Sequence, residues 1–181
     1  MFNNKIKVIW VFSTPYKIPS DIVGCIMPAD YLKMQKLYLS ETDDIFDLLN
    51  TIRPDIIVIG KCFHSNVINL AAEASKRGIK IISCFNDWHF KPTNTKQEKK
   101  FMLNLQLAKQ SNINIVKSVD AGNLLKQNTG LNYEVIPDCI RFKSLNVNTN
   151  LSNKPSLLWF GSSSNHDTLF RGLFEIENKK I

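Results

Sequence analysis

The chain has 181 residues, of which 44% are hydrophobic and 22% charged, a composition typical of a soluble globular protein. This length allows one full domain with a smaller second unit, and the formal net charge of +7 favours anionic partners. The sequence has no nucleic-acid-binding motif, so we expect no nucleic acid among them. The first apolar run, residues 6–12, is too short to span a membrane and lacks a signal-peptide cleavage site.

Short apolar runs alternate with helical stripes along the first three quarters of the chain. The expected strands cover residues 6–12, 37–39, 56–59, 79–85, 113–116 and 133–136. The expected helices cover residues 20–35, 45–52, 67–77, 96–110 and 118–128. Asp43 or Asp44 and Ser118 are expected to cap helices, Gly130 to end one, and Pro28 is an awkward residue inside the first.

Residues 53–90 are predicted to form one strand–helix–strand unit. The run Ile56–Ile59 is apolar on both faces, as is usual for a strand buried in a parallel sheet, and a second buried run follows the helix directly. We therefore predict an α/β fold, with a Rossmann-like doubly wound parallel sheet and a short stub of a second α/β domain. Ile57 and Ile82 are expected to be fully buried in this sheet.

The composition of the sequence changes after Pro137. A polar, asparagine-rich segment without periodicity follows, and a buried strand and a short helix are expected after that segment. We predict a Rossmann-like domain over residues 1–140, a linker over 141–154, and the start of a second domain over 155–181.

Polar residues follow two of the central expected strands. Lys61 and His64 stand between a strand end and a helix start, where backbone N–H groups favour anions such as a sugar phosphate. The alternative is a solvent-exposed lysine and an ordinary loop histidine. Because ligands of doubly wound sheets bind at the carboxyl ends of strands, we regard this corner as a candidate substrate site.

The next strand is followed by Asn86, Asp87, Trp88 and His89. Asn86 and His89 are candidate substrate ligands, and Asp87 is the candidate catalytic base. The alternative is a capping aspartate beside a packed tryptophan. Further along, a small-residue turn at 161–165 precedes an expected helix, and its Gly161, Ser162 and Asn165 are candidates for binding a donor diphosphate.

Several site types have no matching residues. The four cysteines include no C-x-x-C pair, so we expect no metal and reduced thiols in a cytoplasm. A dinucleotide site would need G-x-G-x-x-G after the first strand, where this chain has Ser13, Thr14 and Pro15. A serine hydrolase would need a G-x-S-x-G elbow. We expect no cofactor.

Lysines gather in residues 91–109, where five stand against the single Glu98. One interpretation is a solvated helix face. The other is attraction to phosphates, such as anionic lipid heads or a lipid-linked acceptor, through Lys96, Lys99 and Lys100. The second interpretation predicts a cytoplasmic protein with peripheral contact at the inner membrane face.

The order of several short motifs resembles the GT-B glycosyltransferases, in particular family 4-like members. Arg53-Pro54-Asp55-Ile56 resembles the entry to a central strand of that family. Val135-Ile136-Pro137-Asp138 resembles the end of its first domain, and Leu157-Leu158-Trp159-Phe160-Gly161 the first strand of its donor domain. Lys61 and the pair Asn86-Asp87 look like the family's basic residue and acidic loop. The resemblance covers most of residues 5–172.

The resemblance implies transfer of a sugar from a nucleotide sugar to a glycan or lipid-linked acceptor. The chain departs from the family in two places: the residues before Pro28-Ala29 are apolar, and the E-x7-E carboxylates of the donor domain are absent. We therefore expect no measurable transfer by this chain alone, and a partner chain that completes the donor domain. The alternative is a non-catalytic remnant or binding module.

Overall fold

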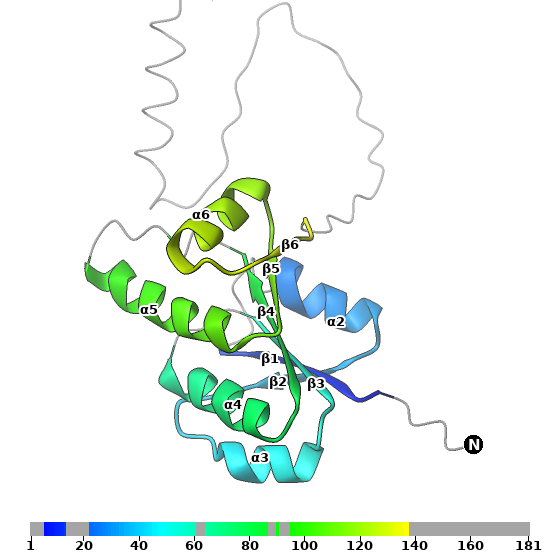
Figure 1. The fold of residues 1–181 in the computed structure, drawn as a ribbon. Coiled ribbons are helices and arrows are strands. Elements are labelled where there is room, and N and C mark those ends of the chain that lie inside the picture. Colours follow the sequence, from blue (N-terminus) through cyan, green and yellow to red (C-terminus); the bar gives the residue numbers. More distant parts are fainter. Residues whose placement is uncertain (1–5, 14–21, 61–63, 87–89, 91–94, 138–181) are drawn as a thin grey trace, which may run out of the picture. The chain divides into compact units, whose positions relative to one another are not determined.

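Among the residues that it describes, the computed structural model has one six-stranded sheet, in the order β2-β1-β3-β4-β5-β6 (Figure 1). The structure describes residues 6–13, 22–60, 64–86, 90 and 95–137. The chain divides into two compact units, Met1–Arg141 and Phe142–Ile181, and the sheet belongs to the first. The predicted linker and second-domain start, residues 141–154 and 155–181, lie outside the described residues.

All neighbouring strands of the sheet run parallel. The strands are β1 (Val8–Phe12), β2 (Gln35–Tyr38), β3 (Ile56–Ile59), β4 (Lys80–Phe85), β5 (Ile113–Val116) and β6 (Glu134–Val135). The helices between them are a π-helical turn η1 (Ile22–Ile26), α2 (Met27–Tyr31), α3 (Ile45–Ile52), α4 (Ser65–Lys76), α5 (Thr95–Gln110) and α6 (Val119–Thr129). The predicted α/β fold with a Rossmann-like parallel sheet is confirmed.

Helices pack on both faces of the sheet, but one face carries many more helical residues than the other. Figure 1 shows α2 on one side of the sheet and α4 and α5 on the other. This follows from the strand order, because the crossover from β1 to β2 runs opposite to all later ones, and right-handed crossovers then put its helix on the opposite face. The main core on the α3–α6 side includes Ile9, Ile57, Leu70 and Ile81, while Trp10, Cys25, Ala29, Val58 and Cys84 form a smaller cluster under η1 and α2.

The unequal cover of the two sheet faces corrects one expectation about the central strands. Ile57 is fully buried, as predicted, but Ile82 is only partly buried. Ile82 pairs in register with Val58 and Ile113 on the face that carries the smaller cluster. Among the described residues, η1 and α2 are the helical segments on this face, and they leave Ile82 in the central strand β4 partly exposed.

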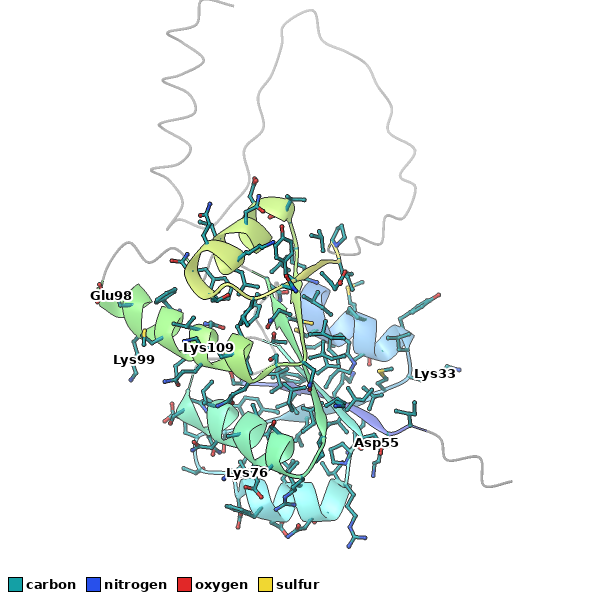
Figure 2. The ribbon with its side chains drawn as sticks, in the orientation of Figure 1. Lys33, Asp55, Lys76, Glu98, Lys99 and Lys109 are labelled. Carbon is teal, nitrogen blue, oxygen red and sulfur yellow. The ribbon has the colours of Figure 1, made fainter. Side chains whose placement is uncertain are left out.

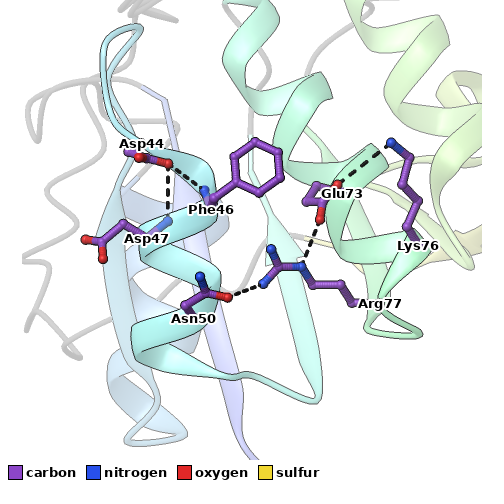
Figure 3. Close-up of polar contacts among 7 residues, drawn as sticks. All are labelled: Asp44, Phe46, Asp47, Asn50, Glu73, Lys76 and Arg77. Carbon is purple, nitrogen blue, oxygen red and sulfur yellow. Dashed lines mark hydrogen bonds and ion pairs between the residues drawn. The ribbon is translucent and has the colours of Figure 1, made fainter.

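Local sequence signals place most helix ends where they were expected. Asp44 caps α3 by accepting hydrogen bonds from the backbone N–H groups of Phe46 and Asp47, at 2.8 and 3.2 Å (Figure 3). Ser118 caps α6 in the same way, and Gly130 ends that helix in the left-handed conformation, with φ 72°. These three positions confirm the expected boundaries.

Helices α3 and α4 are joined at the surface by one arginine. Arg77 donates through Nε to Glu73 at 2.9 Å and through Nη1 to Asn50 Oδ1 at 2.8 Å (Figure 3). Its guanidinium also lies 5.8 Å from the ring centroid of Phe46. The side chain therefore ties the end of α4 to the outer face of α3.

The segment between β1 and β2 differs from the single long helix that was predicted. A π-helical turn leads directly into the short α2, in which Pro28 occupies the first turn. Proline is tolerated there because the N–H groups of a first turn have no partner within the helix. Pro28 is therefore accommodated by a change of helix type at Ile26.

Helix α5 buries a slightly different face from the one that its sequence spacing of Phe101, Leu105 and Ala108 indicates. Ala108 is fully buried, but the other fully buried positions are Leu107 and the polar Asn104, whose Nδ2 donates to the Lys100 carbonyl at 2.7 Å. Leu105 is only half-buried.

In the part of the chain that the structure describes, no helix is long and apolar enough to cross a membrane.

Candidate functional site

The strand order creates one position in the sheet where a crevice is expected. The crossovers that leave β1 and β3 run in opposite directions, and in doubly wound sheets ligands bind at such a switch point, beyond the carboxyl ends of the strands. Among the described residues, Ser13, Gly60 and Asn86 follow directly on β1, β3 and β4. We take this edge as the candidate site.

The turn η1 packs closely against this edge. A Cβ atom on Gly24 would lie 2.3 Å from Nδ2 and 2.6 Å from Oδ1 of Asn86, so only glycine leaves room for that side chain. A Cβ atom on Gly60 would likewise lie 2.7 Å from the Cys25 sulfur, which is also 4.0 Å from Asn86 Nδ2. The two glycines therefore let η1 approach the ends of β3 and β4.

This packing has a consequence for the chemistry of the edge. The Asn86 side chain is held between η1 and the end of β4, one residue before the candidate base Asp87. Its amide offers both donors and an acceptor, with the oxygen buried and the nitrogen facing the Cys25 sulfur. The π-helical form of η1 is also rare, and such turns occur frequently at functional sites.

His64 lies at the neighbouring strand end, but it is buried. Its Nε2 is 3.0 Å from the Leu39 carbonyl oxygen, which links the start of α4 to the end of β2. Two residues on, Asn66 Nδ2 donates to the carbonyls of Ser40 and Asp43, each at 3.0 Å. The first turn of α4 therefore holds the loop between β2 and α3, and the predicted substrate contact of His64 stays a prediction.

Asp43 in that loop has a perturbed carboxyl group. Hydrogen bonds from the backbone N–H of Ser40, at 2.8 Å, and then from the Ser40 side chain lower the pKa of Asp43 below its usual value. Nearby His64 lowers this pKa a little further, while partial desolvation opposes the shift.

This shift gives a testable dependence on pH. Since the folded-state pKa lies below the unfolded one, Asp43 stabilises the fold above the unfolded value of about 3.9 and loses this contribution as the pH falls through the folded pKa. We expect Asp43→Asn to be less stable than the wild type in urea unfolding at neutral pH, with the difference shrinking under acid conditions. A carbon-13 titration that places the Asp43 pKa at or above the unfolded value would contradict the assignment.

The other candidate residues cannot be placed in this way. Lys61, Asp87, His89, Gly161, Ser162 and Asn165 lie outside the described residues. In the described part of the chain, no group of three His, Cys, Asp or Glu side chains could hold a metal ion.

Gly24 and Cys25 were not predicted from the sequence to belong to the candidate site, although a glycine inside a predicted helix is a signal of close packing.

Lys99 and Lys109 lie on an exposed stripe of α5, whereas Lys100, which was also expected to contact phosphates, is half-buried. Lys99, Met102, Gln106 and Lys109 are all exposed, at the spacing of one helix face. Figure 2 shows Lys99 and Lys109 on α5, and Lys33 on the opposite side of the sheet. The side chain of Lys96 lies outside the description.

Comparison with known proteins leaves the family open. No family model matches the chain, and no curated protein matches it. A solved structure that resembles it is the crystal structure of a conserved protein from Enterococcus faecalis V583, at 12% sequence identity and a TM-score of 0.34. The match covers 74% of this chain and 92% of that chain. A likeness of this size supports no conclusion about activity or ligand.

Proposed function

We propose that the chain is a glycosyltransferase-like protein of the GT-B type, which acts with a nucleotide sugar and a glycan or lipid-linked acceptor through its Rossmann-like domain. The observation that carries the proposal is the carboxyl edge at the switch point, where Asn86 is fixed against Gly24. Lys61 follows β3 and Asp87 follows β4 in sequence, so both belong to segments that begin at this edge.

The roles follow from the chemistry of each side chain. Asn86 would bind acceptor hydroxyl groups, and Asp87 would take the proton of the attacking hydroxyl if the transfer inverts the anomeric centre. Lys61 and the N-terminus of α4 would attract a phosphate. His89 would bind the acceptor, and Gly161, Ser162 and Asn165 the donor diphosphate. The reaction needs no metal or other cofactor in this proposal.

A nuclear magnetic resonance titration tests the site directly. UDP-sugars, GDP-sugars and a short polyprenyl phosphate are added separately to nitrogen-15-labelled protein, and sugar transfer is assayed in parallel. We expect shifts at the amides of Gly60, His64 and Asn86, with dissociation constants of about a millimolar, or about −4 kcal/mol.

Two variants make the titration specific. Asn86→Ala should weaken these shifts, whereas Asn132→Ala, an exposed asparagine before β6 and so at the amino edge, should not. Shifts confined to the amino edge, or the absence of any saturable shift, would overturn the proposal. We expect no measurable transfer by this chain alone, and micromolar binding with turnover would contradict that expectation.

The exposed stripe of α5 supports a second element of the proposal, peripheral contact of a cytoplasmic protein with the anionic inner membrane face. Each lysine near an anionic surface contributes about 1 kcal/mol, and salt screens this attraction beyond about 8 Å at physiological ionic strength. We expect the protein to co-sediment with phosphatidylglycerol vesicles at low salt and to be released at high salt.

Two variants distinguish the contribution of the stripe to vesicle binding from that of the overall positive charge. Changing Lys99 and Lys109 together to glutamine should weaken vesicle binding by roughly tenfold or more. Lys33→Gln removes one exposed charge from the opposite side of the sheet and should change binding little. Binding that salt does not affect, or equal losses in both variants, would count against this contact.

A further inference from the structure

We draw no further inference here: the strongest candidate, the apolar patch of Ile82, Ile113 and Ile115 on the sheet face that η1 and α2 cover only in part, leaves Ile113 43% exposed, and nothing in the structure shows what covers it.

Discussion

Replacing Ile57 by alanine is expected to lower the free energy of unfolding by about 2–5 kcal/mol. Ile57 lies in β3, pairs in register with Ile9 and Ile81, and is fully buried in the main core. The substitution removes buried methyl and methylene groups and leaves a cavity that the rigid neighbouring strands cannot fill. Urea unfolding followed by circular dichroism would measure the loss.

Ile82 supplies the matched control for this experiment. It is the same residue type in the adjacent strand β4, but it is only partly buried on the thinly covered face. We expect Ile82→Ala to cost less, about 1–2 kcal/mol. A loss below about 0.5 kcal/mol for Ile57→Ala, or equal losses for both variants, would show that the two faces are not covered as described.

The second large effect is expected at the contact between η1 and β4. Gly24→Ala places a methyl group 2.3–2.7 Å from three side-chain atoms of Asn86, so that the side chain must leave its position. Overpacking of this kind typically costs about 1–3 kcal/mol. The site should be affected as well, because the displaced amide lies at the edge where substrate binding is proposed.

A double-mutant cycle isolates this contact from any general effect of alanine in the turn. Asn86→Ala removes all three crowded atoms, so adding it to Gly24→Ala should recover much of the lost stability. The coupling energy expected for residues in direct contact is about 0.5–3 kcal/mol. Additive losses would mean that Gly24 and Asn86 do not touch in solution.

The sequence predicts the sheet well because its signals there are local. Continuous apolar runs mark β1, β3 and β4, and Asp44, Ser118 and Gly130 use side-chain or backbone chemistry that works within a single turn. The burial of Ile82 is a different kind of question. It depends on which crossover helices lie over its face, and no pattern within β4 carries that information.

Two polar features of the fold could not be predicted from sequence patterns for a similar reason. Ser83 and Asn114 are buried in β4 and β5, where the Ser83 hydroxyl donates to Asn114 Oδ1 at 2.7 Å. Each residue alone would suggest an exposed position, and only the register of the two strands brings the partners together. The close contact of η1 with Asn86, a residue 62 positions after Gly24, is equally a product of the tertiary fold.

The short β6 has a consequence for how the protein behaves at high concentration. An edge strand offers unpaired backbone groups to which a strand of another molecule can add, and long, flat edges favour aggregation. Here β6 has only two residues in the sheet, and Pro137, two positions after its end, has no N–H group to donate. The far edge of the sheet is therefore a poor template for intermolecular strand pairing.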